Sequence, residues 1–159
     1  MSRIFILSGP VHSGKTTRLM KWAVSHSGID GIFQPVVDGK RFLYHLGSRT
    51  LKPLETESEN DYISIGKYKF SIESFKWSQA LLEESLRKEL DWLIIDEIGP
   101  LELAGKGIEP AFSKILSAAE SVPFNILCVV REEMLDKFVK HYYLENKFKI
   151  FDIAEETGA

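Results

Sequence analysis

Apolar runs alternate along the chain with stretches in which apolar side chains recur at helical spacing. The apolar runs are short, as in strands that are buried on both faces of a parallel sheet. They cover residues 4–7, 92–95, 124–130 and 148–153. The stretches of helical spacing cover about residues 15–27, 72–89, 108–121 and 132–142. Because strands and helices alternate, we predict an α/β fold with a mostly parallel sheet flanked by helices.

The period changes after the first helical stretch, where two strand-like segments follow each other directly. Segments 31–37 and 40–46 flank Asp38-Gly39, a dipeptide favoured in the two-residue turn of a β-hairpin. Pro35 predicts an edge or a bulge in the first strand, because proline has no N–H to donate to a sheet.

The region after this hairpin has weaker signals. Residues 47–61 are predicted to form a polar loop, and one further strand, in 62–65 or 67–71, is expected to return to the hairpin. We therefore predict one domain over residues 1–159, with a β-hairpin excursion at about 31–71.

The first apolar run leads into the pattern Gly9-x-x-x-x-Gly14-Lys15-Thr16, and helical spacing follows at once. A strand, a loop of this pattern and a helix are typical of phosphate-binding P-loop proteins, and this context makes a chance glycine-rich turn the weaker alternative. Glycines let successive N–H groups point at phosphate oxygens, and the helix N-terminus adds positive potential. We expect Lys15 to bind the β- and γ-phosphates and the Thr16 hydroxyl to ligate Mg²⁺. The predicted nucleotide-binding residues are Gly9, Pro10, Val11, His12, Ser13, Gly14, Lys15, Thr16 and Thr17.

Two adjacent carboxylates, Asp96 and Glu97, follow the apolar run 92–95. This places Asp96 at the carboxyl edge of the predicted sheet, where it can hold Mg²⁺ together with Thr16. Side chains of adjacent residues diverge at a strand end, so we expect Glu97 to orient and deprotonate a water beside the γ-phosphate. A glutamate in this position favours hydrolysis, whereas a simple polar strand cap is the alternative.

Two basic residues near the same edge have open roles. Arg131 follows the run 124–130, where it can stabilise charge on the γ-phosphate in the transition state or lie in solvent beside a helix. Lys106 lies in a glycine-flanked loop that either closes over the nucleotide or remains a solvated loop.

Length and charge restrict the class of protein. The chain has 159 residues, of which 44% are hydrophobic and 27% charged, as in an ordinary globular domain. Its net charge is −3. The absence of a basic excess argues against nucleic acid as a ligand.

The expected localisation follows from three negative observations. No apolar stretch approaches the roughly 18 residues of a membrane span, and residues 1–20 do not have the pattern of a signal peptide. The only cysteine, Cys128, has no partner for an internal disulfide. We therefore expect a cytoplasmic protein that does not bind membranes.

The segment 93–103, Leu-Ile-Ile-Asp-Glu-Ile-Gly-Pro-Leu-Glu-Leu, resembles the Asp-Glu-Ile-Gly-x-x-Glu-Leu signature of the THEP1-type nucleoside-triphosphatases. The phosphate loop, the Pro-Val-Val-Asp-Gly-Lys-Arg hairpin and a basic residue after the next strand are similar too. The resemblance implies a RecA-like P-loop core with an inserted β-hairpin, and slow Mg²⁺-dependent hydrolysis of ATP, GTP and other nucleoside triphosphates. It also implies that Asp96 holds the metal and Glu97 serves hydrolysis, while Glu102 matches a position without an assigned role.

Two other functions remain open at this point. A nucleotide or small-molecule kinase would share the P-loop core and need an acceptor pocket, for which only the loop 47–61 offers a cover. A weakly hydrolysing adapter would hold its nucleotide stably and act through a protein partner, which the sequence does not identify. No Asn-Lys-x-Asp motif for guanine is present, which agrees with low base selectivity.

Overall fold

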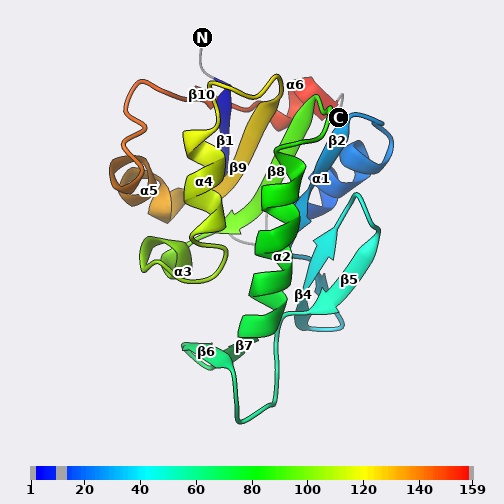
Figure 1. The fold of residues 1–159 in the computed structure, drawn as a ribbon, viewed down its shortest axis with the longest axis vertical. Helices are drawn as coiled ribbons and strands as arrows, with labels where there is room; N and C mark the ends of the chain where they lie inside the picture. Colours follow the sequence, from blue (N-terminus) through cyan, green and yellow to red (C-terminus); the bar gives the residue numbers. More distant parts are fainter. Residues whose placement is uncertain (1–2, 10–13, 158–159) are drawn as a thin grey trace.

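The computed structural model describes residues 3–9 and 14–157 (Figure 1). The strands are β1 (Ile4–Gly9), β2 (Ile29–Phe33), β3 (Val36–Val37), β4 (Lys40–His45), β5 (Thr50–Pro53), β6 (Tyr62–Ile65), β7 (Tyr68–Ser71), β8 (Trp92–Ile98), β9 (Asn125–Arg131) and β10 (Lys149–Ile150). The helices are α1 (Lys15–Val24), α2 (Ile72–Ser85), α3 (Pro100–Leu103), α4 (Ala111–Ser117), α5 (Leu135–His141) and α6 (Ile153–Thr157), with a 3-10 turn, η1, at Glu132–Met134. Within the described ranges, each helix is too short or too polar to cross a bilayer.

The main sheet has a parallel centre with the strand order β10-β1-β9-β8-β2. β4 runs antiparallel to β2, and β3 and β5 both pair with β4. The predicted α/β fold with a mostly parallel sheet is therefore confirmed. Because β9 separates β1 from β8, the strand before the predicted phosphate loop and the strand that carries Asp96 are next-nearest neighbours.

Helices cover both faces of this sheet, and β8 contributes to both cores. Leu93 and Ile95 are buried in the core formed with α2, α4 and α5, whereas Trp92 and Ile94 are buried in the core formed with α1. Figure 1 shows α2 and α4 lying across the near face of the sheet. This two-sided burial explains why β8 is a continuous apolar run without polar alternation.

The close approach of β2 to β8 requires a glycine. Gly31 pairs with Ile94 in the parallel register, and a Cβ at Gly31 would overlap the carbonyl oxygen of Ile94. At Gly31, the backbones of β2 and β8 therefore approach each other without a side chain between them.

The predicted hairpin is confirmed at its turn but wrong in its first strand. Asp38 and Gly39 have φ angles of 51° and 77°, the left-handed pair that a two-residue hairpin turn needs. The strand expected over 31–37 is divided at Gln34-Pro35, so that β2 joins the parallel sheet and only β3 forms the hairpin with β4. The carbonyl of Pro35, between β2 and β3, still accepts a hydrogen bond from the Phe42 N–H of β4, at 3.0 Å. This bond holds the connection between β2 and β3 against β4.

The region after the hairpin contains more strand than predicted. The expected loop 47–61 includes β5, a strand with alternating half-buried and exposed side chains that pairs with β4. The strand expected to return to the hairpin is instead two strands, β6 and β7, which pair with each other. A single bridge, from Glu55 to Phe70, links β7 to the segment that follows β5.

Several predicted helix and strand ends are also wrong. α1 and α2 end earlier than expected, at Val24 and Ser85, while α4 begins after Pro110 because a residue before proline avoids helical backbone angles. The strand expected over 148–153 is only Lys149–Ile150, and α6, which follows it at Ile153–Thr157, was not predicted. The four-residue α3 was not predicted.

A charge network around the buried Asp30 joins β2, β4 and the turn that follows α2. The Asp30 carboxylate accepts hydrogen bonds from the Gly47 N–H at 2.9 Å and from Lys88 Nζ at 2.7 Å. His45 Nε2 lies 3.2 Å from the same carboxylate. Burial alone would raise the pKa of Asp30, but the His45 and Lys88 contacts outweigh it and hold that pKa well below its usual range.

Substitution of Gly31 by alanine tests the contact between β2 and β8. We expect Gly31→Ala to lower the free energy of unfolding by about 1–3 kcal/mol, because the new methyl group forces the two strands apart. Urea denaturation measures this change. A variant as stable as the parent protein would show that the strands adjust without cost.

Candidate active site

The predicted site residues meet at the carboxyl edge of the parallel strands. β1 and β9 end side by side, with Gly9 paired to Arg131, and Ile98 at the end of β8 is paired to Val130. α1 begins at Lys15, directly after Gly14, whose φ of 80° is left-handed. The predicted nucleotide-binding residues Pro10, Val11, His12 and Ser13 lie outside the described residues.

Thr16 and Asp96 are in direct contact. The Thr16 hydroxyl donates a hydrogen bond to Asp96 Oδ2 at 2.8 Å, and the Gln34 N–H donates to the same oxygen at 3.1 Å. Asp96 is only 2% exposed, and its other oxygen, Oδ1, is buried without a hydrogen-bond partner among the described residues. Burial and the nearby charge of Glu97 raise the pKa of Asp96 to about 6.

Such an arrangement suits a bound cation. A hard divalent ion prefers hydroxyl and carboxylate oxygens, and its charge would favour the ionised form of Asp96. Within residues 3–9 and 14–157, no cluster of three or more His, Cys, Asp or Glu side chains offers a metal site built from protein ligands alone. Asp96 and Thr16 therefore fit an ion that takes its remaining ligands from phosphate and water.

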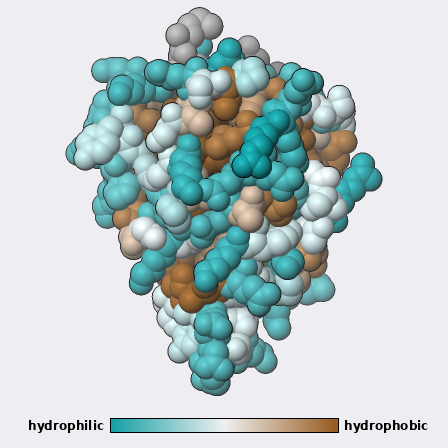
Figure 2. All heavy atoms as spheres, viewed as in Figure 1, coloured by the Kyte–Doolittle hydropathy of each residue, from teal (hydrophilic) through white to brown (hydrophobic). Residues whose placement is uncertain are grey.

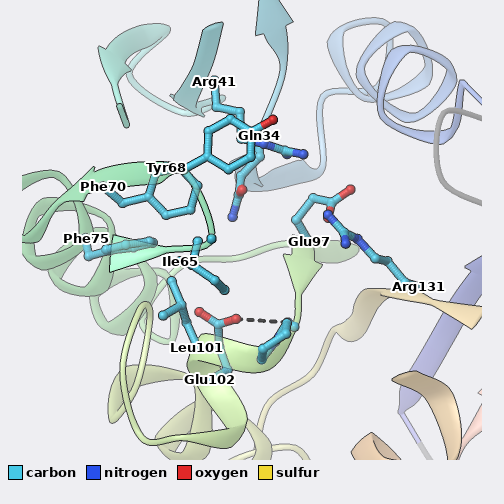
Figure 3. Close-up of a pocket in the computed structure, with 13 residues that line it drawn as sticks. Gln34, Arg41, Ile65, Tyr68, Phe70, Phe75, Glu97, Leu101, Glu102 and Arg131 are labelled. Atoms are coloured by element: carbon cyan, nitrogen blue, oxygen red, sulfur yellow. Dashed lines mark hydrogen bonds and ion pairs between the residues drawn. The ribbon is translucent and has the colours of Figure 1, made fainter. Parts of the chain in front are cut away.

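Glu97 points away from Asp96 because the end of β8 is irregular. The pairing of β8 with β9 shifts between Ile95 and Ile98, and Glu97 has a φ of 57°, which is unusual for a residue with a side chain. Glu97 Oε2 lies 3.5 Å from Arg131 Nε, and both side chains are partly exposed. Figure 3 shows the two side chains facing each other.

Two adjoining cavities lie at this edge. One, of about 220 Å³, is bounded by Lys15, Thr16 and Thr17 at the start of α1. The other, of about 260 Å³, lies between α3 and the β6–β7 hairpin. Glu97 and Arg131 line both cavities.

Lys15 turns back toward the strand that precedes the loop. Its Nζ donates a hydrogen bond to the carbonyl oxygen of Gly9 at 3.1 Å. The ammonium group thus lies at the edge of the smaller cavity, together with the start of α1.

Gln34 and Arg41 are cavity residues that the sequence did not indicate. Both line the two cavities. Gln34 follows β2, and its backbone N–H donates a hydrogen bond to the Asp96 carboxylate. This contact can be recognised only from the pairing of β2 with β8. For Arg41, the one available signal was its place in the Pro-Val-Val-Asp-Gly-Lys-Arg hairpin.

Glu102 ties down the segment that follows β8. Its Oε1 accepts a hydrogen bond from the Gly99 N–H at 2.9 Å, and its Oε2 accepts one from the Ile108 N–H at 3.1 Å. A Cβ at Gly107 would overlap this carboxyl group. Glu102 thereby holds together the loop around α3, which follows shortly after Glu97. The role of Glu102 is therefore structural. Lys106, in the same loop, is exposed and lines neither cavity.

The pKa of Glu102 gives a pH-dependent prediction. Burial raises this pKa from 4.5 to about 7, although the hydrogen bonds from the two N–H groups act to lower it. The folded protein therefore binds the proton more tightly than the unfolded chain, and the stabilisation is complete below about pH 4.5 and lost as the pH rises through about 7. We expect a loss of up to about 3 kcal/mol across this window.

Urea denaturation of the parent protein and Glu102→Gln at several pH values measures this contribution. Glu102→Gln carries an amide that does not titrate, so it should lack this part of the pH dependence. Glu84→Gln, on the exposed face of α2, is the control. Equal slopes in all three proteins would contradict the assignment.

Comparisons with known proteins place the chain in a family. Residues 4–158 match the model of the NTPase family, and a search of the curated proteins finds no significant match. The chain is similar to the solution structure of a human cancer-related nucleoside triphosphatase, with 23% identity, a TM-score of 0.69, and 95% of this chain and 88% of that chain covered. It is also similar to the crystal structure of THEP1 from the hyperthermophile Aquifex aeolicus, with 17% identity, a TM-score of 0.64, and 94% and 89% covered. These likenesses establish the P-loop NTPase fold. Because the family match spans nearly the whole chain, this protein belongs to the NTPase family and is a nucleoside-triphosphatase.

Proposed function

We propose that this enzyme hydrolyses Mg²⁺-bound ATP, GTP and other nucleoside triphosphates to the diphosphate and phosphate, with Glu97 activating the water. The observation that carries the proposal is the divergence of Asp96 and Glu97 at the end of β8. Asp96 contacts Thr16 at the start of α1, whereas Glu97 faces Arg131 in the adjoining cavities. One carboxylate is thus available to a metal and the other to a water.

Thr16 and Asp96 are the residues that would hold Mg²⁺. Asp96 Oδ1, which has no partner among the described residues, and the Thr16 hydroxyl are both oxygen ligands of the kind that Mg²⁺ accepts, directly or through its water shell. When bound, the ion neutralises charge on the β- and γ-phosphates.

The phosphates would lie over the start of α1. Lys15 supplies a full positive charge there, and the first N–H groups of the helix point in the same direction. In the proposal, Gly9 to Thr17 form the complete phosphate loop, including residues 10–13.

Glu97 would act as the general base. It accepts a proton from the water as the water oxygen bonds to the γ-phosphorus, while the bond to the bridging oxygen breaks. Arg131 Nε, at 3.5 Å from Glu97 Oε2, keeps positive charge beside the transferring phosphoryl group. The absence of a guanine-reading motif supports low base selectivity.

We also propose that residues 1–159 act as one domain in the cytoplasm. Support comes from the buried, unpaired Cys128, which agrees with a reducing compartment. The net charge of −3 argues against nucleic acid as a partner.

Replacement of the proposed base tests the mechanism. We expect Glu97→Gln to lower kcat for phosphate release from Mg-ATP by about a hundredfold or more, because the amide cannot take the proton. Nucleotide affinity, measured by titration calorimetry, should change little. Glu133→Gln, in the exposed η1 turn, is the matched control. Turnover that is unaffected by Glu97→Gln would exclude this residue as the base.

Arg131 is tested separately. We expect Arg131→Ala to lower kcat at least about tenfold with little change in nucleotide affinity, as for a cation that acts mainly in the transition state. Steady-state phosphate release and nucleotide titration measure the two effects. Arg87→Ala, in the exposed turn that follows α2, is the control. Loss of affinity without loss of kcat would instead assign Arg131 to ground-state binding.

A further inference from the structure

The larger cavity lies against the proposed site of phosphoryl chemistry but outside the phosphate-binding part. It does not include Lys15 or Thr16, yet it shares Gln34, Arg41, Glu97 and Arg131 with the smaller cavity. A molecule in the larger cavity would therefore be separated from a bound triphosphate only by these side chains. Glu97 is accessible from both sides.

The opposite wall of this cavity is apolar and aromatic. Tyr68 and Phe70 of β7, Phe75 at the start of α2, and Leu101 of α3 form it. The rings of Tyr68 and Phe70 are stacked, with centroids 5.9 Å apart and planes inclined by 15°. Figure 2 shows hydrophobic surface where the β6–β7 hairpin meets α3, and Figure 3 shows these side chains around the cavity.

The polar side of the cavity carries groups without partners. Among the described residues, neither the Arg41 guanidinium nor the Gln34 carboxamide has a hydrogen-bond or ion-pair partner in the structure, although the backbone N–H groups of Arg41 and Gln34 donate to the Glu55 and Asp96 carboxylates. An amide and a guanidinium at the edge of an apolar chamber can bind the heteroatoms of a ring or its hydroxyl groups.

Hydrolysis alone does not need this chamber. A water beside Glu97 occupies a small part of about 260 Å³, and aromatic walls bind water poorly. A planar ring with a hydroxyl group fits all three features, because the ring can stack on the aromatic wall, its edge can meet Gln34 or Arg41, and its hydroxyl can reach Glu97. A nucleoside combines these features.

We propose that the larger cavity binds a nucleoside and that the enzyme transfers the γ-phosphoryl group to its hydroxyl in place of water. This inference rests on the proposed NTPase site, because the same Glu97 and phosphate loop serve both acceptors.

The transfer is balanced without a further reactant. The hydroxyl oxygen of the nucleoside bonds to the γ-phosphorus as the bond from that phosphorus to the bridging oxygen breaks. The hydroxyl proton moves to the Glu97 carboxylate, and the electron pair of the broken bond stays on the nucleoside diphosphate. The products are a nucleoside monophosphate and a nucleoside diphosphate.

The test uses the full chain with Mg-ATP labelled in the γ-phosphate and each of adenosine, guanosine, cytidine, uridine and thymidine. Chromatography separates labelled inorganic phosphate from labelled nucleoside monophosphate. We expect label in at least one monophosphate. Label in inorganic phosphate alone, with all five nucleosides, would overturn the transfer and leave the hydrolase proposal standing. No release and no transfer would count against both.

Variants of the aromatic wall locate the acceptor. Tyr68→Ala should raise KM for the nucleoside roughly tenfold or more through loss of stacking, while Tyr68→Phe should retain it. Tyr62→Ala, in the same hairpin but not lining the cavity, is the matched control for hairpin folding. If Tyr68→Ala leaves the nucleoside KM unchanged, or affects it no more than Tyr62→Ala, the nucleoside does not bind in this cavity.

Discussion

The hydrogen bond from Thr16 to Asp96 is the contact on which the geometry of the site depends. A carboxylate that is 2% exposed is costly unless its charge is compensated, and burial raises its pKa to about 6. Thr16 and the Gln34 N–H meet one oxygen of this carboxylate. One bond therefore ties α1 to β8, the other ties the end of β2 to β8, and three segments distant in sequence are aligned around a single side chain.

This arrangement requires an unusual backbone conformation at the end of β8. With Asp96 turned into the sheet edge, Glu97 can reach the cavities only through a left-handed backbone and a register shift against β9. Glu102 holds the following loop through the N–H groups of Gly99 and Ile108, so the irregular strand end is fixed on both sides. The Asp-Glu-Ile-Gly-x-x-Glu-Leu segment thus combines two carboxylates at the proposed site with a third that shapes the loop after them.

Local patterns were sufficient to predict the parallel core, the Asp38-Gly39 turn and the neighbourhood of Thr16 and Asp96. Each depends on a short-range signal, such as an apolar run, glycine spacing or a turn dipeptide. β5 was missed because its four residues carry no continuous apolar signal and gain their hydrogen bonds from β4. The four-residue α3 depends on Glu102, and the cavity positions of Gln34 and Arg41 depend on strand pairing, so neither could be predicted from sequence periodicity.

The excursion between β2 and α2 decides what can approach the phosphate site. β4 brings Arg41 to the cavity edge, and β7 brings an aromatic wall opposite Glu97, although neither belongs to the parallel core. The core by itself would leave Glu97 open to water, and water would then be the only acceptor at hand. An apolar chamber on that side lowers the local concentration of water and offers binding energy to a planar acceptor. In the proposed mechanism, the choice between hydrolysis and transfer therefore depends on the β6–β7 hairpin and α3 rather than on the predicted phosphate loop.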